Sequence, residues 1–180
     1  MPPSALHVEL TKRTRRWMRR RATGAGVAWA SEVYLGQGYV ADAVLVGSLQ
    51  HRFWLEVTKS NIEEFRALGS RDRVIAPEKL VIVFEAKVSR SDFLATFSRE
   101  NGNRLAPAGN LHYLVASDNL TNFDCLPGWW GILQQSGNGL RQIRPSIYRD
   151  VAEQQLWHAG FRVLLAQRSA ISNQQSAIPE

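Results

Sequence analysis

The pattern of apolar and polar residues predicts a sheet of several strands. Residues 80–88 form a nearly continuous apolar run of the kind found in a buried central strand. The glycines around Gln37 and Asn138 predict turns that join neighbouring strands into two hairpins. Apolar runs and alternation predict strands over residues 31–35, 39–46, 51–58, 80–88, 111–116, 129–134 and 140–144.

Helical spacing appears at both ends of the chain and between the strands. Residues 5–22 contain no proline, and Leu10, Trp17 and Met18 predict a narrow apolar stripe on this helix. Ser89 and Asp92 have the spacing of a capping box, which predicts a helix from there to about residue 100. Further helices are predicted over residues 61–68 and 148–167.

This order of elements predicts an α/β fold with an αβββαβ core, in which a mixed central sheet is flanked by helices. The 180 residues fit one such domain with a core of useful size. We expect a basic N-terminal helix over residues 1–22 and the main domain over residues 23–168. The Gln- and Ser-rich residues 169–180 predict a disordered polar tail.

The positive charge is concentrated near the N-terminus. The net charge is +6, and without one cluster the acidic and basic residues would nearly balance. Such a local cluster predicts contact with a polyanion. Its removal with residues 1–21 is expected to weaken that contact and to leave in place the candidate site residues described below. The cluster consists of Lys12, Arg13, Arg15, Arg16, Arg19, Arg20 and Arg21.

Several function classes are disfavoured. Cys125 is the only cysteine and the four histidines lack ligand spacing, so a zinc site is not expected. Phosphate-binding glycine motifs are missing, so no nucleotide cofactor is expected. No apolar run approaches the roughly 20 residues of a membrane span. Residues 19–31 imitate an export signal, but this stretch is barely hydrophobic, and a cytoplasmic protein is expected.

Charged residues interrupt two strands that are otherwise apolar. Alternation along a strand directs Glu85 and Lys87 to one side and Ala86 to the other. Asp42 interrupts the predicted strand 39–46 in the same way. Buried charges are costly unless they are paired or bind an ion, and two carboxylates on adjacent strands would suit Mg²⁺. The alternative is a simple ion pair between Glu85 and Lys87 at the end of the strand.

The residues that carry a family resemblance are Ala41-Asp42-Ala43 and the segments 84–94 (FEAKVSRSDFL), 110–116 (NLHYLVA) and 126–133 (LPGWWGIL). Together they resemble the PD-(D/E)xK nuclease superfamily, and most of all a phage and bacterial branch that includes MmcB-like DNA-repair proteins. This resemblance implies a restriction-endonuclease-like fold for the αβββαβ core. The extension E-x-K-x-S-x-x-D-[FW] is more specific than E-x-K alone. The resemblance covers roughly residues 30 to 135.

The resemblance implies a role for each matching residue. Asp42 and Glu85 would ligate Mg²⁺ or Mn²⁺ with help from the Ala86 carbonyl, and Lys87 would orient or activate the attacking water. Glu32 matches an acidic position that touches a metal or its water; an exposed acid beside the hairpin is the alternative. The chain departs from the pattern by Ala-Asp in place of Pro-Asp and by the long segment 47–79 between the motifs.

The function implied is that of a metal-dependent DNA endonuclease in DNA repair or phage DNA processing. The main alternative is a catalytically silent DNA-binding or recruitment module, and a basic assembly protein with a coincidental E-x-K is a third. Oligomers are compatible with each. Arg90, Arg99 and Arg104 are candidate phosphate contacts, although exposed arginines are usually only solvated. Trp129 and Trp130 either stack on bases or lie on opposite faces of a strand.

Overall fold

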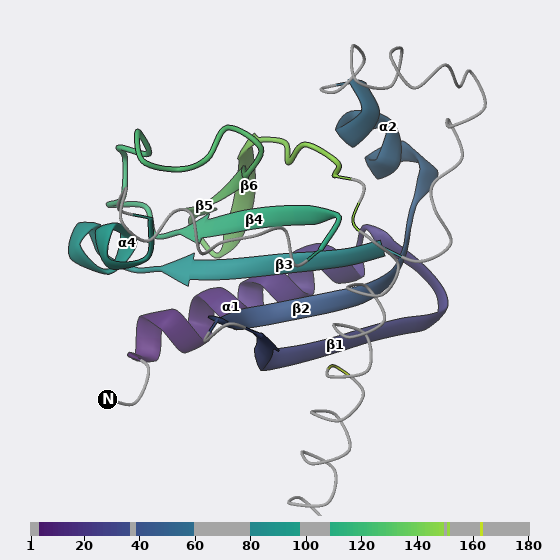
Figure 1. Ribbon diagram of the computed structural model, residues 1–180, viewed down its shortest axis with the longest axis horizontal. Helices are drawn as coiled ribbons and strands as arrows, with labels where there is room; N and C mark the ends of the chain where they lie inside the picture. The colour runs from purple at the N-terminus through teal and green to yellow at the C-terminus, as the bar shows by residue number, and fades with distance from the viewer. Residues whose placement is uncertain are drawn as a thin grey trace, which may run out of the picture.

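The computed structural model describes residues 4–36, 39–59, 80–97, 109–149, 151 and 163. These residues form a mixed α/β fold in which helices flank a curled mixed sheet (Figure 1). The helices are α1 (Ala5–Arg19), α2 (His51–Lys59) and α4 (Arg90–Phe97). The strands are β1 (Ala22–Gly36), β2 (Tyr39–Leu49), β3 (Leu80–Lys87), β4 (Leu111–Ala116), β5 (Gly131–Ser136) and β6 (Gly139–Arg144).

The strands follow one another in the sheet in the order of the sequence, β1-β2-β3-β4-β5-β6. The β1–β2, β2–β3 and β5–β6 pairs are antiparallel, whereas β3–β4 and β4–β5 are parallel. The two parallel pairs need crossover connections, and α4 lies in the first of them. The mixed character expected from the sequence is therefore confirmed.

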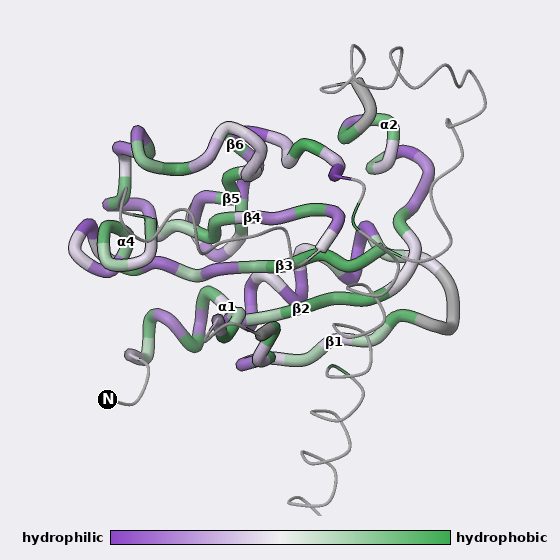
Figure 2. The backbone as a smooth tube through the Cα atoms, in the orientation of Figure 1, coloured by the Kyte–Doolittle hydropathy of each residue, from purple (hydrophilic) through white to green (hydrophobic). Residues whose placement is uncertain are grey.

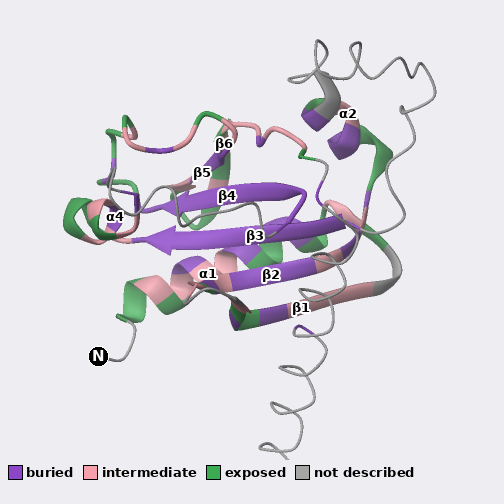
Figure 3. Ribbon diagram, in the orientation of Figure 1, coloured by how far each residue is buried: buried purple, intermediate pink, exposed green. Residues whose placement is uncertain are grey.

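Strand β3 occupies the centre of the sheet, and all of its residues are buried (Figure 3). Ile82 and Phe84 pack in the cluster that includes α1 and α2, while Val81 and Val83 pack on the opposite face. Figure 2 shows how β3 changes along its length, from hydrophobic at its beginning to hydrophilic at its end. The end of β3 therefore places Glu85 and Lys87 at one edge of the hydrophobic core.

Helix α1 is part of the hydrophobic core. Ser4 caps its N-terminus and accepts a hydrogen bond from the His7 amide. The predicted stripe is confirmed, because Leu10, Trp17 and Met18 are buried. The helix ends at Arg19, before the predicted boundary, since Ala22 already pairs with Leu49 in β1. Removal of residues 1–21 would therefore take away core side chains as well as charge.

Helix α2 contradicts the strand predicted over residues 51–58. Phe53, Trp54 and Val57 are all buried, and only a helix places positions three and four apart on one face. Alternation with a period of two would have exposed part of this set. The aromatic and β-branched composition was a weaker guide than the spacing.

The ends of several strands also differ from prediction. β1 begins at Ala22 and includes the stretch that imitates an export signal. β5 begins at Gly131, so Trp129 and Trp130 precede the strand and do not lie on its two faces. A Cβ atom on Gly131 would lie only 2.4 Å from the Tyr113 ring, which explains why glycine begins this strand.

The cap predicted for the helix after β3 is confirmed. The Asp92 amide donates to Ser89 Oγ, and Asp92 Oδ2 accepts from the Val88 amide. Phe93 and Phe97 are the buried residues of α4. Within the described part of the chain, no helix is long and apolar enough to cross a membrane.

Some predicted features lie outside the described residues: the helix over 61–68, Arg99, Arg104 and the tail 169–180. Of the helix predicted over 148–167, Tyr148, Arg149 and Val151 are not helical. Val163 is helical and buried among the residues of the second sheet face, and the other positions are not described.

Candidate functional site

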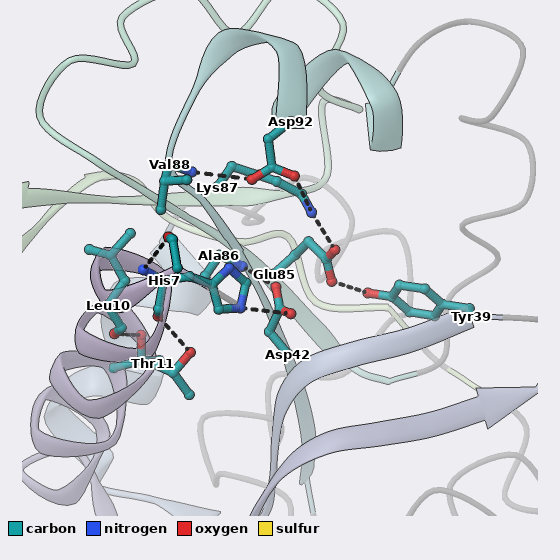
Figure 4. A network of polar contacts seen from close by, with 12 residues as sticks. His7, Leu10, Thr11, Tyr39, Asp42, Glu85, Ala86, Lys87, Val88 and Asp92 are labelled. Atoms are coloured by element: carbon teal, nitrogen blue, oxygen red, sulfur yellow. Dashed lines mark hydrogen bonds and ion pairs between the residues drawn. The ribbon is translucent and has the colours of Figure 1, made fainter. Parts of the chain in front are cut away.

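The site begins where β2 and β3 separate. Their ladder runs from Gly47–Leu80 to Ala43–Phe84 and stops there. The next residue of β2 is Asp42, and its Oδ2 accepts a hydrogen bond of 2.7 Å from the Ala86 amide (Figure 4). A side chain thus satisfies the buried donor that the strand backbone no longer reaches.

Glu85 and Lys87 meet at the end of β3, as alternation predicted. Lys87 Nζ lies 2.8 Å from Glu85 Oε1, and the exposed fractions of the two residues are only 6% and 5%. The second oxygen, Glu85 Oε2, accepts a hydrogen bond of 3.2 Å from the Tyr39 hydroxyl. Figure 4 shows Asp42, Glu85 and Lys87 gathered in one place.

Asp92 connects the site to helix α4. Besides capping the helix, it places Oδ1 3.5 Å from Lys87 Nζ. The ammonium of Lys87 therefore lies between one buried carboxylate and one partly exposed carboxylate. The sequence had indicated Asp92 only as a cap; in the structure it also helps to hold Lys87.

His7 belongs to the site, and sequence reasoning missed it. Its Nε2 lies 3.1 Å from Asp42 Oδ1, so both oxygens of Asp42 have protein partners. His7 lies in the first turn of α1, fixed by the Ser4 cap. A lone histidine far from the motif gives no local signal, and only the packing of α1 on the sheet brings it to Asp42.

The charges in the site shift one another's pKa values. Burial, and then the nearby negative charge of Asp42, raise the pKa of Glu85 to about 7. For Lys87, burial opposes the charged form, but the Glu85 and Asp42 carboxylates outweigh it and raise its pKa. The hydrogen bond to Asp42 raises the pKa of His7. Lys87 is therefore a cation at neutral pH, and Glu85 loses its proton at a pH of about 7.

The donor chemistry fits a hard divalent cation. Carboxylate oxygens are the ligands that Mg²⁺ prefers, and Mg²⁺ keeps several waters, so two carboxylates and a backbone carbonyl can suffice. Burial raises the pKa of Glu85 most, and repulsion by Asp42 adds to it; a cation between Asp42 and Glu85 would relieve that repulsion. Among the described residues, no three or more His, Cys, Asp or Glu side chains form a ready-made metal cluster.

Glu32 lies opposite Asp42 on the neighbouring strand, between the Ser31–Ala43 and Val33–Ala41 pairs of the β1–β2 ladder. Its φ of 54° is in the left-handed region, where residues with a side chain are strained. Glu32 and Asp42 line one surface pocket of about 340 Å³. No described contact joins Glu32 to Glu85.

The basic N-terminal cluster divides into groups with different surroundings. Arg13 and Arg16 both bind Glu9 at 3.0 Å, and Arg13 also donates to the Gly137 carbonyl. The Arg21 guanidinium lies 3.7 Å from the centroid of the Trp17 ring. The exposed residues Lys12 and Arg15 line the pocket beside Asp42, and Arg19 and Arg20 are exposed elsewhere on the surface.

The other candidate DNA contacts have partners within the protein. Arg90 is exposed, donates to the Asn122 carbonyl and lies over the Phe93 ring. Trp130 is completely buried, at an edge-to-face distance of 5.0 Å from Phe97, so it is a core residue. Trp129 is half-buried, with the Arg149 guanidinium 5.1 Å from its ring centroid.

Comparison with known proteins gives a likeness of fold. No protein-family model and no curated protein matches the chain. One solved structure is similar: the "SPO1766 protein of unknown function from Silicibacter pomeroyi", with a TM-score of 0.61 and 15% sequence identity. The match covers 99% of this chain and 98% of that one. The whole described architecture therefore has a counterpart among solved proteins.

Proposed function

We propose that this protein is a metal-dependent DNA endonuclease of the PD-(D/E)xK type, acting in DNA repair or phage DNA processing. The observation that carries the proposal is the convergence of Asp42, Glu85 and Lys87 where β2 and β3 separate. Two interacting carboxylates beside a buried ammonium are costly to stability, and such arrangements are typical of functional sites. The simple ion pair does not account for Asp42.

The order of elements supports a restriction-endonuclease-like core. In sequence, α1, β1, β2, β3, α4 and β4 give the αβββαβ order, with α2 and residues 60–79 inserted between β2 and β3. The long separation of the two motifs does not prevent pairing, since Val44 of β2 pairs with Val83 of β3. The inserted segment leaves the central strands adjacent.

Asp42, Glu85 and the Ala86 carbonyl would hold Mg²⁺ or Mn²⁺. When bound, such a cation polarises a phosphodiester and lowers the pKa of its bound water. Glu85 would bind the cation in its deprotonated form, and Lys87 would orient or activate the attacking water. Lys87 supplies fixed positive charge beside the phosphate, where negative charge develops during hydrolysis.

One observation favours the alternative of a catalytically silent DNA-binding module. Both oxygens of Asp42 and both oxygens of Glu85 already have partners in the protein. A cation would compete with His7 for Asp42, and with Tyr39 and Lys87 for Glu85. If these contacts persist in the presence of Mg²⁺, the fold would bind DNA without cutting it.

Cleavage of DNA tests the proposal directly. The purified chain should nick or degrade plasmid and oligonucleotide DNA with Mg²⁺ or Mn²⁺, and EDTA should stop the reaction. Asp42→Asn, Glu85→Gln and Lys87→Met should each lose at least a hundredfold in rate while remaining folded. Asp118→Asn, an exposed acid outside the site, is the matched control.

DNA binding without cleavage under either metal would support the silent module. Cleavage that survives Asp42→Asn and Glu85→Gln would contradict the proposed site. Absence of both DNA binding and DNA cleavage would contradict the nuclease proposal and the silent-module alternative.

A further inference from the structure

The pocket beside Asp42 lies between α1 and β1, and we call it the α1–β1 pocket. His7, Thr11, Lys12 and Arg15 line it from the helix, and Trp29 and Glu32 from the strand. Its volume of about 340 Å³ lies within the range of small-ligand sites. Asp42 forms part of its wall, so anything bound there lies next to the proposed reaction centre.

The helical wall carries the cations Lys12 and Arg15 on one side of α1. Positions 7, 11 and 15 are four residues apart, and 12 and 15 are three apart, so these side chains lie on one side of the helix. Lys12 and Arg15 are exposed. Arg13 and Arg16, in contrast, share the single carboxylate of Glu9. The pocket is therefore lined by two exposed cations of α1 that have no acidic partner among the described contacts.

The strand wall offers an aromatic ring and a carboxylate. Trp29 is half-buried, and its ring lies 5.6 Å from the Phe84 ring, which anchors it in the core. Glu32 is held in the left-handed region, a strain of about 1–3 kcal/mol that persists only where the surroundings impose it. A base could stack on the indole and donate a hydrogen bond to the carboxylate.

We propose that the α1–β1 pocket receives an unpaired nucleotide of the DNA strand, with Lys12 and Arg15 binding the phosphates that follow the reacting one. This inference rests on the proposed function and names its substrate as DNA with single-stranded character, such as an overhang, a flap or a loop. Cationic and anionic walls on opposite sides match a nucleotide, which joins an anionic phosphate to a base with amino donors.

The spacing along α1 agrees with a strand that continues past the reaction centre. At a rise of about 1.5 Å per residue, Lys12 and Arg15 lie roughly 7.5 and 12 Å beyond His7 along the helix axis. A stacked strand carries about one phosphate per 3.4 Å, so these cations would meet phosphates about two to four nucleotides away. A pocket of this volume would not admit a base that remains paired within a duplex.

The test compares DNA binding by the full chain and by a double variant, Lys12→Gln/Arg15→Gln. Fluorescence anisotropy with a labelled single-stranded oligonucleotide, in EDTA, separates binding from cleavage. A single strand contributes about −0.7 to the salt slope per phosphate contact, so the double variant should flatten the slope by about 1.4. The control with the same charge change is Arg52→Gln/Arg141→Gln, two exposed cations outside the site.

A second variant blocks the pocket without changing charge. Val8 is 39% exposed and lines the pocket, so Val8→Trp should fill part of its volume while α1 remains folded. We expect at least a tenfold loss of single-strand affinity. Binding to a blunt duplex of the same length should be weaker than single-strand binding in the wild type and little changed in the variant. Circular dichroism checks the fold of each variant.

The outcomes separate this inference from the proposed function. Cleavage with unchanged single-strand binding in both variants would overturn the pocket inference and leave the nuclease standing. Single-strand binding that depends on Lys12 and Arg15, without cleavage under any metal, would support the pocket and overturn the nuclease. Stronger binding to blunt duplex than to single strand would overturn the pocket inference alone, and no binding to DNA would remove both.

Discussion

The Asp42 carboxylate accepts a hydrogen bond from the Ala86 amide. The backbone ladder between β2 and β3 ends at the Ala43–Phe84 pair, and this side-chain hydrogen bond continues the connection between the two strands. Asp42 therefore has a structural role separate from its charge. Asp42→Asn keeps an acceptor for the amide and should change the free energy of unfolding little. Asp42→Ala leaves a buried donor unpaired and should cost about 1–3 kcal/mol. Urea unfolding of both variants measures the difference, and equal stabilities would contradict the structural role.

Glu85 should make the protein less stable as the pH rises. Burial and the charge of Asp42 raise its pKa from 4.5 to about 7, so folding takes up a proton between these values. Its contribution to stability falls through this window, by up to about 3 kcal/mol, and is constant above it. Glu85→Gln removes the effect and should be more stable than the wild type at pH 8. Parallel slopes of stability against pH for the two proteins would refute this.

Cation binding should show the opposite dependence on pH. A cation held by Asp42 and Glu85 competes with the proton on Glu85, so its affinity should rise with pH up to about 7 and then level off. Calorimetric titration with Mn²⁺ at pH 6 and pH 8 measures this, and bound cation should also raise the melting temperature. The Glu85→Gln variant is the control. Binding that is equally strong in that variant would place the cation elsewhere.

Glu32 offers a test that separates strain from function. Because Glu32 has a φ of 54°, its substitution by glycine should relieve backbone strain and raise the free energy of unfolding by about 1 kcal/mol. If Glu32 contributes to the site, the same substitution should lower cleavage and single-strand binding. Glu32→Asn keeps a side chain that tolerates this conformation, and it should show the loss of activity with less change in stability. Full activity in both variants would leave Glu32 with no role in the site.

His7 should stabilise the fold mainly at lower pH. Its hydrogen bond to Asp42 raises its pKa above 6.5, so its contribution is complete below that value and is lost as the pH rises through the higher folded pKa. The stability difference between the wild type and His7→Leu should therefore be larger at pH 6 than at pH 9. His7→Gln keeps a donor and should restore part of the loss at pH 9. A difference that does not vary with pH would mean that the contact with Asp42 contributes nothing.

The sequence predicted best the elements whose signals are local. The buried run of β3, the Ser89 and Asp92 cap, and the meeting of Glu85 with Lys87 depend on residues within a few positions of one another. Alternation along a strand and hydrogen bonding within a helix turn are short-range rules, so they hold without knowledge of the whole fold.

Other parts of the site depend on contacts between distant segments. His7 and Tyr39 complete the site, but they are 35 and 46 residues away from the acids they contact. Helix α2 was mistaken for a strand because its aromatic composition outweighed its helical spacing. The structure was also needed to tell the N-terminal cations that contact Glu9 or Trp17 from those that line the pocket beside Asp42.

The packing of α1 determines when the helix can reach its final position during synthesis on the ribosome. Helix α1 contacts β1, β3, β4 and β6, so most of its partners are synthesised long after the helix itself. At about 5–20 residues per second, roughly 5 to 20 seconds separate the synthesis of α1 from that of β4. During this time the stripe of Leu10, Trp17 and Met18 has no sheet to cover it. A nascent basic helix with an uncovered apolar face is a natural client for a chaperone at the ribosomal exit.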